Sequence, residues 1–143
     1  MKTYLFVYGT LMSGESRNYT IRYFGRYVRN VCISGFRMYD YYEGGYPVVR
    51  RTDNVHDIVV GELWELSEDS HDQLSILPFL DDMEGVPILY NRITVTLDSG
   101  TKAFVYCGNW ETWKDRLGEN DVWPSGMRWE GQTMKSHWYL KEN

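Results

Sequence analysis

The segment at residues 58–66 restricts the fold of this chain more than any other. Its sequence, IVVGELWEL, is rich in the β-branched and aromatic residues that fit a pleated strand. Successive side chains of a strand point to opposite faces, so Val60 and Trp64 share one face and Val59 and Leu63 share the other. Neither face is purely polar. We therefore expect a strand that is covered by packed material on both sides.

Several other segments have the composition of strands and are bounded by turn residues. Residues 4–8 predict a buried first strand, because an aromatic and β-branched run stops at Gly9. Two alternating runs surround the turn Asp98-Ser99-Gly100-Thr101, a pattern that is typical of a β-hairpin. In chain order, the expected strands are residues 4–8, 31–33, 36–39, 58–66, 90–97 and 102–107.

Helices are expected in two regions. Ser13 or Ser16 is suited to cap a short helix that runs through residues 19–24. Ser67 is followed by two acidic residues and predicts the start of a longer helix, because acids are favourable at the positive end of the helix dipole. Pro78 has no N–H and fits poorly in a helix interior, so we expect a break and a second short helix that begins there.

The length and the charge of the chain limit its organisation and its partners. The 143 residues contain no repeat or linker, so we expect one domain that spans residues 1–143. The formal net charge is -5 and the longest basic run is Arg50-Arg51, which argues against a nucleic-acid partner. The first apolar stretch ends at Gly9, too early for a signal peptide or a membrane span, so we expect a cytoplasmic protein with no membrane partner. In that compartment, Cys32 and Cys107 are expected to be buried thiols.

The C-terminal part of the chain is rich in tryptophan. We expect it to wrap around the body of the domain, since indole rings bury large apolar areas. An alternative is that this part forms an interface for self-association, which would make the protein a homo-oligomer. Five of the six tryptophans lie here: Trp110, Trp113, Trp123, Trp129 and Trp138.

Sequence motifs for most cofactor chemistries are absent. The chain has no Gly-x-Gly-x-x-Gly, no phosphate-binding glycine loop with Lys, no His-Glu-x-x-His and no Cys-x-x-Cys. It also lacks a Gly-x-Ser-x-Gly elbow, and its histidines, at positions 56, 71 and 137, do not accompany a plausible nucleophile. We therefore expect no organic cofactor and no metal.

Glu84 is the strongest candidate for an acid/base group. It follows Leu77 by seven residues and Leu80 by four, which places all three on one face if the local path is helical. Its carboxyl would then face the core, where burial and the negative end of a helix dipole raise a carboxyl pKa and allow proton exchange near neutral pH. The alternative is a structural carboxylate that is paired with Arg92 or capped by Tyr90. The neighbouring acids, Asp81 and Asp82, are expected to be solvated.

The loop after the first strand is a second candidate for a functional element. Gly9 has no side chain, so the N–H groups of Gly9, Thr10 and Leu11 can turn toward a ligand, and such groups suit an anion. The alternative is that Gly9 only makes a turn.

Four motifs occur in a characteristic order along most of the chain: Val7-Tyr8-Gly9-Thr10-Leu11, Tyr46-Pro47, Val60-Gly61-Glu62-Leu63-Trp64, and Leu80-Asp81-Asp82-Met83-Glu84-Gly85 followed by Tyr90-Asn91-Arg92. Together they resemble the γ-glutamylcyclotransferase-like superfamily, including its AIG2-like branch that acts on γ-glutamylamines. Residues 124–129 look like the Ser-Gly-Asp-Trp turn of that superfamily, except that Met127-Arg128 stands where one Asp would be.

The resemblance implies an α+β fold: a small mixed β-barrel, closed or nearly closed, with a few flanking helices. It also implies an enzyme that releases 5-oxoproline from a γ-glutamyl amine, peptide or amino acid, with Glu84 as the catalytic acid/base. Tyr90 and Tyr106 are expected to shape the pocket, and strand packing explains these two tyrosines at least as well. The expected substrate-binding residues are Tyr8, Gly9, Thr10, Leu11, Tyr90 and Tyr106.

In such a reaction the α-amine of the substrate attacks its own γ-carbonyl, so no protein nucleophile is required. The sequence leaves the departing amine open: a free amino acid, a peptide, a lysine side chain or a small metabolite amine. It also leaves open a function of another class, a non-catalytic domain of the same fold that binds a small metabolite.

Overall fold

The strand expected at residues 58–66 is present as β5 (Ile58–Leu66) in a computed structural model of the protein, which describes residues 2–67 and 70–130. Both faces of β5 are covered, as predicted, since Val59 and Gly61 to Leu66 are buried. The fold is α+β and is built mostly from strands. In chain order, its elements are β1 (Thr3–Val7), α1 (Tyr19–Arg22), β2 (Gly25–Ser34), β3 (Phe36–Tyr41), β4 (Tyr46–Arg51), β5, α2 (Ser70–Met83), β6 (Tyr90–Thr96), β7 (Lys102–Gly108), α3 (Trp110–Trp113) and the 3-10 turn η1 (Glu119–Asp121).

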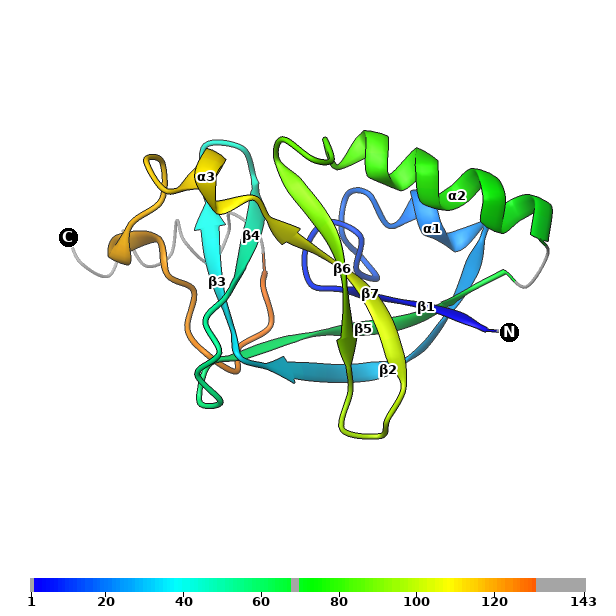
Figure 1. The fold of residues 1–143 in the computed structure, drawn as a ribbon, viewed down its shortest axis with the longest axis horizontal. Coiled ribbons are helices and arrows are strands. Elements are labelled where there is room, and N and C mark those ends of the chain that lie inside the picture. Colours follow the sequence, from blue (N-terminus) through cyan, green and yellow to red (C-terminus); the bar gives the residue numbers. More distant parts are fainter. Residues whose placement is uncertain (1, 68–69, 131–143) are drawn as a thin grey trace.

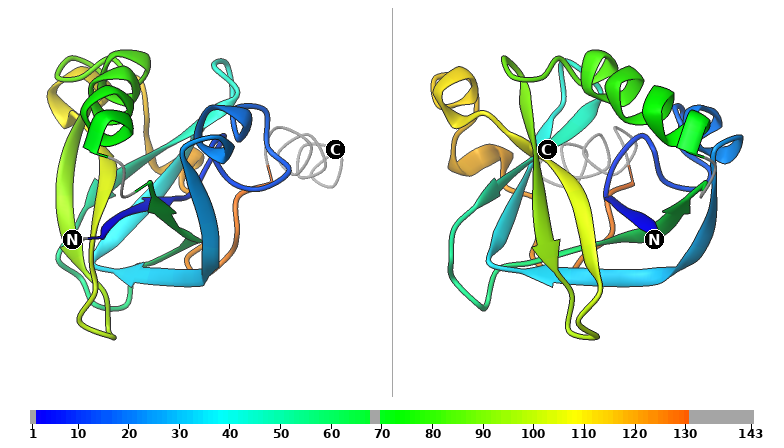
Figure 2. Two further views of the ribbon diagram at one scale, coloured as in Figure 1. Left: turned by 90° about the vertical axis from the view of Figure 1, so that its right-hand side faces the viewer. Right: turned by 45° about the vertical axis from the view of Figure 1, so that its right-hand side comes forward.

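The strands of the described residues form two sheets (Figure 1). The larger has five strands in the order β2-β5-β1-β7-β6. The first strand, β1, lies in the middle of this sheet, antiparallel to β5 and parallel to β7, where Leu5 is opposite Phe104. The smaller sheet is the antiparallel β3–β4 hairpin. Helix α2 lies on one side of the molecule, and the turn between β6 and β7 lies on the opposite side (Figures 1 and 2).

The resemblance implied a mixed β-barrel that is closed or nearly closed, but the larger sheet is not closed into a barrel. Closure requires continuous backbone pairing around a ring of strands. In residues 2–67 and 70–130, the larger sheet ends at β2 on one side and at β6 on the other, while β3 and β4 pair with each other. The hairpin reaches the β6–β7 end through side chains instead: the Tyr90 hydroxyl donates to the Pro47 carbonyl at 2.8 Å, and the Cys107 thiol to the Val49 carbonyl at 3.3 Å. These contacts hold the hairpin in place without a backbone ladder.

The tryptophans of the described C-terminal segment pack onto the body of the domain, as expected. Trp113, Trp123 and Trp129 are buried, each with at most 2% of its surface exposed. The Trp129 indole N–H donates to the buried Asp40 carboxylate at 3.0 Å, which ties the segment to β3. Trp138 lies outside the described residues.

Helix α2 differs from the expectation in one respect, because it continues through Pro78 without a break. The core contacts of Ile76 and Leu80, both almost completely buried, lie on either side of the proline and hold the two halves in one helix. The expected start at Ser67 leads into residues 68 and 69, which are outside the described part of the chain. No described helix has the length and apolarity needed to span a bilayer.

Two smaller expectations were wrong. The N-cap residue of α1 is Asn18 rather than Ser13 or Ser16, and its side-chain amide donates to the Leu11 carbonyl at 2.8 Å instead of capping the helix. Cys32 is exposed, because it lies on the outward face of β2 at the edge of the sheet, whereas Cys107 is half-buried.

Candidate active site

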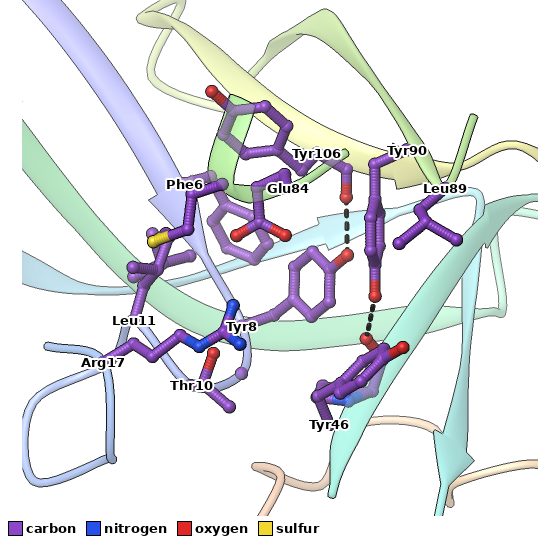
Figure 3. A pocket seen from close by; sticks show the side chains of 14 residues that line it. Phe6, Tyr8, Thr10, Leu11, Arg17, Tyr46, Glu84, Leu89, Tyr90 and Tyr106 are labelled. Atoms are coloured by element: carbon purple, nitrogen blue, oxygen red, sulfur yellow. Dashed lines mark hydrogen bonds between the residues drawn. The ribbon is translucent and has the colours of Figure 1, made fainter. Parts of the chain in front are cut away.

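One cavity, of about 120 Å³, brings together all of the residues that the sequence analysis proposed for the site (Figure 3). Its wall combines the end of β1 and the following loop with the C-terminal end of α2 and the starts of β4 and β6. The lining residues are Phe6, Val7, Tyr8, Gly9, Thr10, Leu11, Arg17, Tyr46, Pro47, Met83, Glu84, Leu89, Tyr90 and Tyr106.

Glu84 owes its position to the way in which α2 ends. Its N–H still bonds to the Leu80 carbonyl at 2.9 Å, and Gly85 then adopts the left-handed conformation, with φ 69°. The N–H groups of Gly85 and Val86 bond back to the carbonyls of Asp82 and Asp81, at 3.1 and 2.9 Å. This is a Schellman motif, for which glycine is the preferred residue. The motif therefore fixes Glu84 at the last turn, at the negative end of the helix dipole.

The carboxyl of Glu84 faces the side of the cavity on which Tyr8 and Arg17 lie (Figure 3). Burial raises the pKa of this carboxyl from 4.5 to about 7, and the charge of Arg17 acts in the opposite direction. A group with this pKa is present in both its acidic and its basic form near neutral pH.

The alternative role of Glu84, a structural carboxylate that is paired with Arg92 or capped by Tyr90, is not formed among the described residues. Arg92 pairs with Asp81 instead, with its Nε 3.3 Å from Oδ1. The Tyr90 hydroxyl is used by the Pro47 carbonyl. The expectation that Asp81 is solvated was therefore wrong: it is half-buried and also accepts a hydrogen bond from the Tyr106 hydroxyl at 2.8 Å.

The loop after β1 is held from several sides. The Tyr8 hydroxyl donates to the Tyr106 carbonyl at 2.5 Å, and the Thr10 carbonyl accepts the Arg17 N–H at 2.8 Å. Gly9 packs so closely against the hairpin that an added Cβ would lie 2.6 Å from Cγ of Pro47, which explains why Gly9 and Pro47 occur together. Within the described chain, the N–H groups of Gly9, Thr10 and Leu11 donate to no protein acceptor. Backbone donors at a cavity wall with no protein partner are suited to a ligand or to water.

The tyrosines of the cavity are neutral hydrogen-bonding groups. Burial raises the pKa of Tyr8 and of Tyr90 well above the usual value, and the neighbouring acidic groups act in the same direction. Tyr106 contributes its backbone carbonyl to Tyr8 and its hydroxyl to Asp81, so it links β7 to both the loop and α2.

Sequence analysis missed Arg17. It lies between the loop and α1, in no recognised motif, and only the three-dimensional path of the chain brings it to the cavity that contains Glu84. A lone arginine in a polar segment gives no local signal of such a position.

The second feature that sequence analysis missed is a partly buried ion pair behind the loop, in which Glu62 is buried and Arg128 is half-exposed. Arg128, from the segment in which Met-Arg replaces an Asp of the resembled motif, donates to Oε2 of Glu62 at 2.8 Å. Oε1 of Glu62 accepts the Ser13 N–H at 2.7 Å and the Trp64 indole N–H at 3.1 Å. Burial acts to raise the pKa of Glu62, but these hydrogen bonds outweigh it and lower the pKa below 4.5. The ionised pair thus connects the C-terminal segment to the far end of the cavity loop.

The fold is shared with several solved structures. An AIG2-like protein from Mus musculus is 21% identical, with a TM-score of 0.65 over 90% of this chain and 88% of that chain. A protein specific to uropathogenic E. coli is 22% identical, with a TM-score of 0.62 over 85% and 89%. An uncharacterized protein from Pyrococcus horikoshii is 17% identical, with a TM-score of 0.58 over 99% and 98%. At these identities, the likeness establishes the fold alone.

The fold is therefore of the γ-glutamyl cyclotransferase-like type. Residues 5–129 match the family described as "Gamma-glutamyl cyclotransferase, AIG2-like", and the chain belongs to this family. No match is found among curated proteins.

Proposed function

We propose that the protein is a γ-glutamyl cyclotransferase that converts a γ-glutamyl amine, peptide or amino acid into 5-oxoproline and a free amine. The observation that supports this most directly is the position of Glu84. Its carboxyl has a pKa of about 7, and Glu84 lines the same cavity as Gly9, Thr10 and Leu11, whose N–H groups donate to no protein acceptor in the described residues. Family membership over residues 5–129 supports the same reaction class.

In the proposed mechanism, Glu84 is the general base and then the general acid. It removes one proton from the α-ammonium of the glutamyl group, and the resulting amine attacks the γ-carbonyl carbon to close a five-membered ring. The bond from that carbon to the departing nitrogen then breaks, and Glu84 delivers its proton to this nitrogen. The ring nitrogen loses a second proton, which the released amine takes up, so that 5-oxoproline and an ammonium ion are the products.

The loop from Gly9 to Leu11 would stabilise charge during these steps. Its unused N–H groups can hold either the carboxylate of the substrate or the oxyanion that develops on the γ-carbonyl oxygen. Tyr90 and Tyr106 close the wall next to them and restrict the orientation of the glutamyl chain.

Two contributions from the protein are enough to lower the barrier of the proposed reaction: alignment of the reacting atoms and acid/base help. A well-aligned intramolecular attack can supply about 7–11 kcal/mol of the barrier reduction. General acid/base help from a group with a pKa near the working pH contributes roughly 10²–10⁴-fold. A cavity that holds the glutamyl chain in a folded conformer, with its α-nitrogen against the γ-carbonyl carbon, and that supplies one tuned carboxyl therefore meets both requirements.

Release of 5-oxoproline from a panel of γ-glutamyl amines, peptides and amino acids tests the proposal. We expect turnover of at least one class and a loss of roughly 10²–10⁴-fold in kcat for Glu84→Gln. Asp82→Asn is the matched control, because Asp82 lies on the same helical turn and is exposed. Turnover that Glu84→Gln leaves unchanged would overturn the mechanism. A complete lack of turnover across the panel would favour a metabolite-binding domain instead.

A further inference from the structure

Arg17 lines the cavity, and its backbone is fixed to the loop that forms the cavity wall. Its N–H donates to the Thr10 carbonyl at 2.8 Å, and its own carbonyl accepts the Thr20 hydroxyl at 2.7 Å. The adjacent residue, Asn18, is buried and binds the Leu11 carbonyl. The guanidinium therefore extends into the cavity from a backbone segment that hydrogen bonds hold in place (Figure 3).

Among the residues whose side chains the structure describes, 2–67 and 76–130, no acidic group forms an ion pair with Arg17. Of the described side chains that line the cavity, Arg17 and Glu84 are the two charged ones. Burial raises the pKa of Glu84, and Arg17 lies close enough to oppose this rise. The cavity thus presents one cation beside one proton acceptor.

A γ-glutamyl group has the complementary arrangement. Its α-carbon bears a carboxylate and an ammonium, so these two charges always lie side by side. If Glu84 takes a proton from the ammonium, the carboxylate must lie on the neighbouring wall. A guanidinium offers two parallel N–H donors to a carboxylate, which fixes its orientation as well as its position.

We infer that Arg17 binds the α-carboxylate of the glutamyl group, which leaves the amides of Gly9, Thr10 and Leu11 to hold the oxyanion on the γ-carbonyl oxygen. This inference rests on the proposed function and assigns the two anionic groups of the reaction to different parts of the site. It makes Arg17 the residue that selects substrates with an α-carboxylate. It also orients the chain so that the α-nitrogen lies between Glu84 and the carbonyl carbon.

Two anilides that differ only in the α-carboxylate test the inference. γ-Glutamylanilide has this carboxylate and yields 5-oxoproline, whereas γ-aminobutyrylanilide lacks it and yields 2-pyrrolidinone. We expect the wild-type protein to prefer the first in kcat/KM by roughly 10- to 100-fold, as a charge-assisted hydrogen bond would provide. At a pH where Glu84 is ionised in both proteins, Arg17→Met should remove most of this preference, because it slows the first substrate much more than the second.

Controls separate recognition from general damage. Arg22→Met removes an exposed arginine from the neighbouring helix α1 and should change the turnover of neither substrate. Arg17→Lys retains the charge without the fork of donors and should fall between wild type and Arg17→Met. An equal loss of both substrates in Arg17→Met would overturn the inference, since that result indicates a structural role or an effect on Glu84 alone.

Product binding distinguishes failure of this inference from failure of the proposed function. Calorimetry with 5-oxoproline should show an affinity that falls roughly 10- to 100-fold in Arg17→Met. The same fall is expected when Arg17→Met is introduced into Glu84→Gln, which the mechanism makes inactive. A protein that turns over no γ-glutamyl compound but shows this loss would contradict the proposed function and retain the carboxylate site. Equal affinity of wild type and Arg17→Met for 5-oxoproline overturns the site whatever the turnover results.

Discussion

The guanidinium of Arg128 lies 2.8 Å from the carboxylate of Glu62, which has only 3% of its side-chain surface exposed. The pair connects two segments that are far apart in sequence, because Glu62 also holds the Ser13 N–H at the end of the cavity loop. Removal of one partner of a buried pair is costly, since the other charge remains in a poorly solvated place.

Arg128→Met should lower the free energy of unfolding by about 1–3 kcal/mol at pH 7, less than for a fully buried pair because Arg128 itself is 34% exposed. The folded-state pKa of Glu62 is lowered, so its contribution is present above the unfolded-state pKa and is lost as the pH falls through the folded value. Urea denaturation of both proteins at pH 7 and pH 3 measures this, and the difference should shrink at the lower pH. Lys114→Met breaks an exposed pair with Glu111 and should leave the stability nearly unchanged at both pH values.

Activity should depend on the ionisation of Glu84. The base form is needed to accept the first proton, so kcat/KM should rise roughly tenfold per pH unit in the acid range and level off above a pKa of about 7. Rates of 5-oxoproline release between pH 5 and pH 9 give the profile. Arg17→Met should move its midpoint upward, because the arginine opposes the effect of burial on the carboxyl. A midpoint near 4.5 in the wild-type protein would contradict the position of Glu84 in the cavity.

The same carboxyl should make the wild-type protein less stable at higher pH. Its folded-state pKa is raised, so its stabilising contribution is complete below pH 4.5 and is lost as the pH rises through about 7. Glu84→Gln lacks this titration and should be more stable than wild type at pH 8 by about 2–3 kcal/mol. Denaturation at pH 4 and pH 8 tests the sign: the advantage of the variant should be confined to the higher pH. Asp82→Asn should behave alike at both.

Gly85→Ala should weaken both stability and activity. An alanine at φ 69° costs about 1–2 kcal/mol, and its Cβ would lie 3.0 Å from Cδ1 of Leu89. The Schellman motif would relax, and Glu84 would move with it. The kcat should therefore fall by more than the increase in the unfolded fraction accounts for. Gly100→Ala is the matched control, because Gly100 has φ +88° at the β6–β7 turn, away from the cavity, with no atom within 4 Å of an added Cβ. It should lose stability alone; equal loss of activity in both variants would contradict the role of the motif.

The local elements could be predicted from sequence because their signals are local. The alternating runs of β6 and β7 and the two-sided apolar pattern of β5 reflect the period of a strand, which a few residues define. Each of these predictions depends on atoms within a few residues of one another.

The predictions that failed depend on distant contacts. The effect of Pro78 on α2 is decided by how Ile76 and Leu80 pack in the core, and not by the proline alone. Barrel closure depends on whether the β3–β4 hairpin pairs with the edges of the larger sheet, which no property of the hairpin sequence determines.

The candidate site shows the same division. Glu84 and the Tyr8–Leu11 loop belong to contiguous motifs, so both could be proposed in advance. The roles of Arg17 and of the Glu62–Arg128 pair depend on segments that are separate in sequence. Arg17 lines a cavity that several segments build together, and the ion pair forms where β5 meets the C-terminal segment. Neither has a characteristic spacing along the chain.

The parallel pairing of β1 with β7 has a consequence for biosynthesis. During translation, one edge of β1 can be covered by β5 once residue 66 has been made, but the other must wait for the strand that begins at Lys102. A nascent chain or a proteolytic fragment that stops earlier exposes this edge, which is a template for association with other chains. Conversely, a peptide that spans residues 90–108 is a natural candidate for complementing such a fragment in trans, as in a split-protein reporter.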